Sequence, residues 1–114
     1  MNKINPQEGI DSKLSAEDEK KLLDVHSKLA LISSTENSLI QIEVLFFDML
    51  TILRQYHNSI KAETLLNELR SIHDNEYKLV QNKQLTVKNR VAAIRKFKNS
   101  FRQSIRKAIR YKPQ

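Results

Sequence analysis

Apolar residues return every three or four positions through most of the chain, and breaks in this spacing divide it into four segments. The first segment has its apolar stripe at Leu22, Val25, Leu29 and Ile32. Such spacing gathers side chains on one face of an α-helix. Ser15, in the stretch S-A-E-D, can cap this helix, and Asp18 can reach back toward the backbone. We therefore predict a first helix that begins after Ser15 and ends before the polar stretch at 33–38.

The second segment is the most apolar part of the chain. It follows the stretch SSTENS, residues 33–38, and runs to about Tyr56. Its apolar residues cover more than one stripe: Leu39, Ile40, Ile42, Val44, Leu45, Phe46, Phe47, Met49, Leu50, Ile52 and Leu53. A helix of this kind is usually buried. We expect it to be the most buried element; its broad apolar surface is either fully covered by the other helices or leaves a patch for a second subunit.

Two amphipathic helices are predicted in the second half of the chain. Ser59 can cap a helix from Ile60 to about Val80, and Thr86 can cap a last helix. The apolar stripe of the last helix is formed by Val87, Val91, Ile94, Phe97, Phe101, Ile105 and Ala108. Since burying each large apolar side chain contributes about 1.5–3 kcal/mol, the two Phe residues indicate that this helix belongs to the core. Four helices with short connections predict an all-α fold, an antiparallel up-and-down four-helix bundle.

The length of 114 residues fits one domain with a single modest core. We predict a flexible leader at residues 1–13, which contain Pro6 and Gly9, and a single four-helix domain at residues 14–112. The N-terminal stretch lacks the apolar region of a signal peptide, and the longest apolar run is VLFF at residues 44–47. These features predict a cytoplasmic protein, and the absence of Cys suits a reducing compartment.

The net charge of +7 is unevenly distributed. Residues 1–76 hold all 13 acidic residues and 8 Lys or Arg, which gives −5. Residues 77–114 hold 12 Lys or Arg and no acidic residue, which gives +12. Dense positive charge of this kind favours binding to nucleic acid, to an anionic membrane or to an acidic protein surface. Charge alone does not choose among them.

The sequence offers no arrangement of residues typical of an enzyme. His26, His57 and His73 have no ligand-type spacing with one another or with a carboxylate, and there is no Cys. The sequence shows no nucleophile next to a base, no paired acids in a cleft-forming pattern and no glycine-rich phosphate loop. We therefore predict a protein that is not an enzyme, with no metal site and no cofactor.

The candidate partner-binding residues are cations of the last helix. They are Arg95, Lys98, Arg102, Arg106, Lys107, Arg110 and Lys112. They could neutralise phosphates of DNA or RNA, although no helix-turn-helix pattern and no exposed aromatic platform accompanies them. They could equally form the basic side of a membrane-surface helix, with Phe and Ile on the other side. The third interpretation is that the charges only solvate one face of the bundle.

Residues 65–86, LLNELRSIHDNEYKLVQNKQLT, resemble the third helix and following turn of the class IIa bacteriocin immunity proteins. In that family a Leu-rich helix is followed by Asn-Lys, a Leu or Phe two residues further on, and a Ser or Thr cap before the last helix. The turn of the family is matched by Asn82, Lys83, Leu85 and Thr86, and its helix is matched by Leu65, Leu66 and Leu69. The chain departs from the family at Glu68, where Arg is common, at residues 61–63, where Pro is common, and in its long leader.

The resemblance implies a small basic four-helix protein that protects the producer cell of a bacteriocin. Such proteins act from the inner side of the membrane on the complex of bacteriocin and sugar permease, and their C-terminal half carries much of the specificity. A basic last helix near anionic lipid is consistent with this location, since each Lys or Arg close to the surface is worth about 1 kcal/mol. Our working hypothesis is therefore a bacteriocin immunity protein at the inner membrane face. The alternative is a small nucleic-acid-binding accessory protein that uses the last helix.

Overall fold

The structure is a computed structural model that describes residues 14–56 and 59–110. Within these residues the chain forms four long helical segments and no strand. The predictions made for the leader at residues 1–13, for His57 and for Lys112 lie outside the described residues. The prediction of an all-α four-helix bundle is confirmed.

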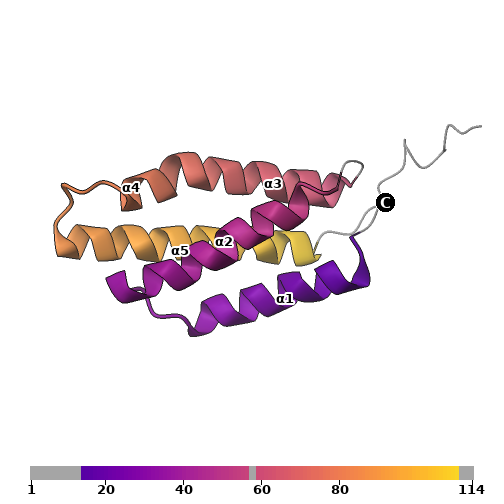
Figure 1. The fold of residues 1–114 in the computed structure, drawn as a ribbon, viewed down its shortest axis with the longest axis horizontal. Coiled ribbons are helices and arrows are strands. Elements are labelled where there is room, and N and C mark those ends of the chain that lie inside the picture. Colours follow the sequence, from indigo (N-terminus) through magenta and orange to yellow (C-terminus); the bar gives the residue numbers. More distant parts are fainter. Residues whose placement is uncertain (1–13, 57–58, 111–114) are drawn as a thin grey trace, which may run out of the picture.

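The helical segments follow the predicted order. They are α1 (Ala16–Leu31), a 3₁₀ turn (Glu36–Ser38), α2 (Leu39–Leu53), α3 (Ile60–Ile72), a π-helical turn (His73–Tyr77), α4 (Lys78–Val80) and α5 (Val87–Arg110). The segments from α3 to α4 follow one another without a break and correspond to the single third helix predicted from the sequence. Figure 1 shows consecutive long helices running in opposite directions, with α2 crossing α5 obliquely.

The predicted caps at Ser15, Ser59 and Thr86 are confirmed. Each hydroxyl oxygen accepts a hydrogen bond of 3.1 Å from the backbone N–H three residues further on. These bonds satisfy N–H groups that have no partner inside the helix. Asp18 does not reach back to the Ser15 N–H as expected. That N–H donates to the Tyr56 hydroxyl, which in turn donates to the Asp18 carboxylate.

The core is built around α5, which packs along both α1 and α3. Phe97 and Phe101 of α5 are fully buried, as predicted, and Phe46 of α2 packs edge-on against both rings. The ring centroids are 5.1 Å apart in each pair, which is a favourable edge-to-face separation. These contacts fix the rotation of α5 about its own axis and therefore decide which of its side chains face outward.

The expectation that α2 is the most buried element is wrong for one of its sides. Ile42, Phe46 and Met49 are buried, but Ile40 and Val44 remain 70% and 54% exposed. Since α2 lies on the outside of the bundle, a helix that is apolar on several sides necessarily leaves one of them uncovered.

Candidate partner-binding surface on α5

The sequence of α5 separates apolar and charged residues onto opposite sides of the helix. The residues buried against the bundle are Ala93, Ile94, Phe97, Phe101, Ser104, Ile105 and Ala108. All of them are small or apolar, and α5 contains no acidic residue. The exposed cations must therefore lie on the side opposite the Phe97–Phe101 contact.

We use the name outer face for the exposed polar residues of this opposite side. They are Lys88, Arg95, Lys96, Asn99, Gln103, Arg106, Lys107 and Arg110. At a rise of about 1.5 Å per residue, the outer face is about 33 Å long. Because Phe97 and Phe101 contact Phe46 of α2, the outer face is turned away from α2.

Four of the predicted partner-binding residues lie on the outer face: Arg95, Arg106, Lys107 and Arg110. Among the described residues, the Nζ atom of Lys107 lies 3.5 Å from the Glu68 carboxylate; Lys107 is exposed and Glu68 is half-buried. Within residues 14–56 and 59–110, no ion pair involves Arg95, Arg106 or Arg110. Their guanidinium groups are thus available to an anionic partner.

Lys98 has a different role from the predicted one. Its Nζ atom donates a hydrogen bond of 2.7 Å to the backbone oxygen of Ile32, at the C-terminal end of α1. A cation at this end of a helix satisfies a carbonyl without a partner and interacts favourably with the helix dipole. Burial lowers the pKa of Lys98, and the charges of Arg102 and Arg95 lower it further. We therefore assign Lys98 to the bundle and not to the outer face.

Arg102 lies at the edge between α5 and α1 and is half-buried. Its charge, together with that of Arg106, lowers the pKa of His26 on α1, although burial of the imidazole is the larger cause. Of the atoms in the described part of the chain, the Nε of Arg102 and the Nε2 of His26 are buried without a hydrogen-bond partner. Because its Nε is buried, we do not count Arg102 with the outer face.

Arg90 is a further cation of α5 that the bundle uses. Its guanidinium donates to the backbone oxygens of Val80, at 2.8 Å, and Asn82, at 2.9 Å. It also pairs with Glu36, at 3.2 Å. Arg90 thus ties the end of α4 and the connection that follows it to the 3₁₀ turn before α2.

Sequence reasoning missed Lys88 and Lys96, which extend the positive charge of the outer face. Lys88 and Lys96 fall on the same side of the helix as Arg95 and Arg106. The helical periodicity of the sequence could therefore have identified them. Asn99 and Gln103 were missed as well and lie between the cations Arg95 and Arg106.

The described part of the chain holds neither a metal-binding cluster nor a helix that could span a membrane. No three His, Asp or Glu side chains within residues 14–56 and 59–110 come together so that they could hold a metal ion. No helix in this part of the chain is both long enough and apolar enough to cross a bilayer. Comparison with known proteins finds no matching family model, no matching curated protein and no matching solved structure.

Proposed function

We propose that the protein is a non-catalytic binding protein of the bacteriocin immunity class. It acts in the cytoplasm at the inner face of the membrane, where the outer face of α5 binds the complex formed by a bacteriocin and its receptor, a sugar permease. The observation that carries this proposal is the row of exposed cations along α5, on a helix without acidic residues.

The packing of α5 supports the proposal. Phe97 and Phe101 are fully buried, and Lys98 ties the middle of α5 to the end of α1. The cations are therefore presented on a fixed helix, which lowers the entropy lost when a partner binds. Several Lys and Arg side chains near an anionic surface each contribute about 1 kcal/mol and raise the rate of association.

The position of the segment that resembles the immunity family also supports the proposal. Residues 65–86 run from α3 through the π-helical turn and α4 into the connection that precedes α5. Arg90 of α5 donates hydrogen bonds to the backbone oxygens of Val80 and Asn82 within this segment. The segment and the outer face are thus parts of one C-terminal unit.

The test is protection of living cells. The full chain is expressed in a sensitive lactic-acid bacterium, and the cells are challenged with a panel of pediocin-like peptides. We expect the inhibitory concentration of at least one peptide to rise at least tenfold over cells that carry an empty vector. Unchanged sensitivity to every peptide of a broad panel, with the protein present at normal levels in the cell, would contradict the proposal.

Nucleic-acid binding is the second candidate function. It is favoured by Asn99 and Gln103, which lie exposed between cations and could hydrogen-bond to base edges. Stacking of bases is not available on α5, because Phe97 and Phe101 are fully buried. This candidate predicts retardation of DNA or RNA that survives near-physiological salt. Retardation that disappears on going from low to physiological salt would indicate only the nonspecific attraction expected of any basic surface.

A further inference from the structure

The side of α2 that faces away from the core exposes three large apolar side chains, where a surface helix is normally polar. This side is formed by Ile40, Val44, Phe47 and Thr51, at successive spacings of four, three and four residues. Ile40 is 70% exposed, Val44 54% and Phe47 40%. The same alternation of spacings forms the contact seam between two packed helices. We call these four residues the α2 seam.

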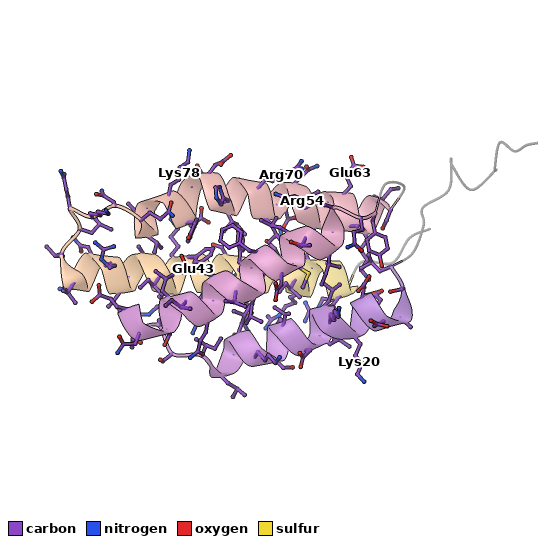
Figure 2. All side chains as sticks on the ribbon, viewed as in Figure 1. Lys20, Glu43, Arg54, Glu63, Arg70 and Lys78 are labelled. Carbon is purple, nitrogen blue, oxygen red and sulfur yellow. The ribbon has the colours of Figure 1, made fainter. Side chains whose placement is uncertain are left out.

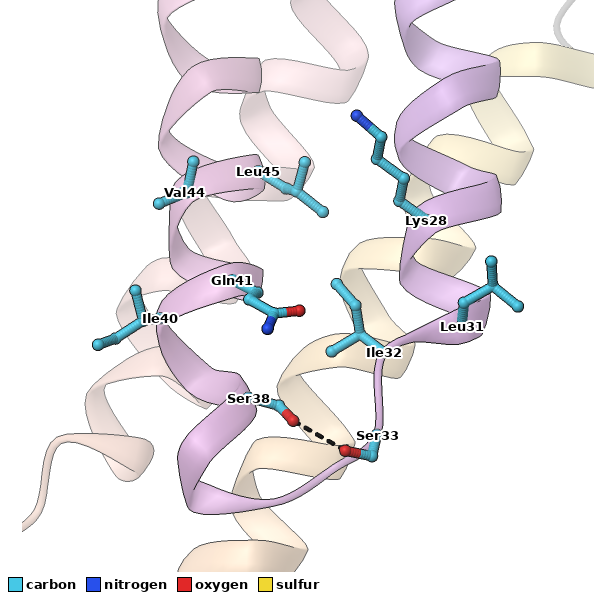
Figure 3. A pocket seen from close by; sticks show the side chains of 9 residues that line it. All are labelled: Lys28, Leu31, Ile32, Ser33, Ser38, Ile40, Gln41, Val44 and Leu45. Carbon is cyan, nitrogen blue, oxygen red and sulfur yellow. Dashed lines mark hydrogen bonds between the residues drawn. The ribbon is translucent and has the colours of Figure 1, made fainter.

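A groove of about 620 Å³ adjoins the α2 seam where α2 lies beside the end of α1. In Figure 3, Gln41, Leu45 and Ile32 point into the groove, while Ile40 and Val44 lie along its α2 rim. The Ser33 and Ser38 hydroxyls, 2.8 Å apart, and the bond from Lys98 to Ile32 hold the connection between the two helices. The apolar surface beside the seam is therefore preformed.

We propose that the α2 seam binds the α2 seam of a second copy of this chain, in an antiparallel arrangement about a two-fold axis. In this arrangement Val44 of each copy lies opposite Phe47 of the other, and Ile40 lies opposite Thr51. Each contact thus joins a larger side chain to a smaller one, as interdigitated packing requires. A two-fold contact uses the same patch on both copies, so a surface that complements itself is sufficient.

The charge on α2 allows two copies to approach each other at the seam. The chain carries a net charge of +7, so two copies repel each other in most orientations. α2 contains no Lys or Arg, and Glu43, one of its two acids, accepts a hydrogen bond from the Tyr77 hydroxyl. The other acid is Asp48, which lies on the flank nearest α1 together with Lys28. Lys28 pairs with Asp24 of its own helix at 3.0 Å, and in the two-fold arrangement it also faces the flank of the other copy that carries Asp48.

The proposed pairing does not depend on the function proposed for α5. The outer face of α5 is turned away from α2, so pairing through α2 leaves the outer faces of both copies uncovered. A single helix pair buries little area compared with stable interfaces, which cover about 800 Å² on each partner. The pairing is therefore expected to be weak and dependent on concentration.

The test is the molar mass of the full chain, measured by sedimentation equilibrium between about 1 µM and 1 mM. We expect the mass to rise from 13.3 kDa toward twice that value as the concentration increases. Val44→Glu places a charge in the middle of the seam, and Ile40→Glu places one near its end. Each is expected to raise the concentration needed for pairing at least tenfold.

Leu23→Glu is the matched control, because Leu23 is 53% exposed on α1 and does not line the groove. This variant is expected to pair like the parent chain. Circular dichroism identifies any variant that fails to fold, and Ile40→Glu replaces Val44→Glu if the latter unfolds. A parent chain that stays at 13.3 kDa up to about 1 mM would overturn the proposal. Equal weakening by Val44→Glu and Leu23→Glu would overturn it as well.

Discussion

At the scale of single residues, Lys98 and Arg95 show how cations of one helix acquire different roles. The sequence identifies both as candidates for binding, because both belong to a segment without acidic residues. Arg95 is exposed and has no ion pair among the described residues, whereas Lys98 is bonded to the carbonyl of Ile32. That carbonyl is 66 positions away in the chain, so no local pattern could have indicated the bond.

The role of Lys98 leads to a prediction about stability. Lys98→Met keeps the apolar stem but removes the ammonium, and leaves the Ile32 oxygen without this donor. Hydrogen bonds that involve a charged group are worth about 1.5–3 kcal/mol, so a loss of free energy of unfolding within about this range is expected in urea denaturation. Lys96→Met, on the exposed outer face, is the control and is expected to change stability by less than about 0.5 kcal/mol. Equal effects of the two substitutions would show that the bond contributes nothing.

Tyr77 leads to a prediction about alkaline pH. Burial, followed by the hydrogen bond to Glu43, raises the pKa of Tyr77 to about 12 from the ordinary value of 10.0. The folded protein therefore retains this proton between about pH 10 and 12, where the unfolded chain has lost it. The contribution of the Tyr77 proton to the free energy of unfolding is fully present below pH 10 and declines as pH rises through this window.

The measurement is urea denaturation of the parent chain and of Tyr77→Phe at pH 9, 10 and 11. Above pH 10, we expect stability to fall less steeply with pH in the variant, because Phe carries no proton to lose. Lysines titrate in the same range in both proteins, so only the difference between the two curves is informative. Parallel curves from pH 9 to 11 would show that Tyr77 does not cause the decline.

At the scale of helices and turns, the sequence predicted most of what the structure contains. The caps at Ser15, Ser59 and Thr86 were visible because capping depends only on neighbouring residues. The π-helical turn at His73–Tyr77 was not predicted. The sequence did contain a signal for this turn. The buried residues Ile72 and Tyr77 are five positions apart, whereas successive buried residues of a regular helix are three or four positions apart.

The cap at Ser59 leads to a prediction at this scale. Ser59 is 1% exposed, and its hydroxyl accepts the N–H of Ala62 at the start of α3. Ser59→Ala leaves that buried N–H without a partner, so the free energy of unfolding is expected to fall by about 1–2 kcal/mol. Ser27→Ala on the exposed side of α1 is the control, with a change below about 0.5 kcal/mol. A Ser59→Ala protein as stable as this control would contradict the capping role.

At the scale of the whole molecule, the important feature is that two unlike surfaces lie on opposite sides. The outer face of α5 is rich in cations, and the α2 seam is apolar. The sequence revealed the uneven charge and the apolar excess of α2, because both are properties of composition. It could not reveal which side of each helix faces outward, because contacts such as those of Phe46 with Phe97 and Phe101 decide this.

The function that we propose requires the outer face of α5 to be the surface that binds the partner. Arg95→Glu with Arg106→Glu reverses two exposed cations of this face and leaves the partly buried Arg102 in place. Arg70→Glu with Lys78→Glu is the matched control. Arg70 and Lys78 are exposed on the α3–α4 side, where Figure 2 shows them pointing away from the bundle. Both double variants change the net charge by the same amount.

The decisive measurement is protection of a sensitive lactic-acid bacterium that expresses the parent chain or either double variant at equal levels. We predict that Arg95→Glu with Arg106→Glu lowers the protective increase in inhibitory concentration at least tenfold, because each reversal replaces attraction by repulsion. The variant Arg70→Glu with Lys78→Glu is predicted to protect like the parent chain. Full protection by the α5 variant, or equal loss in both variants, would contradict the claim that the outer face of α5 binds the partner.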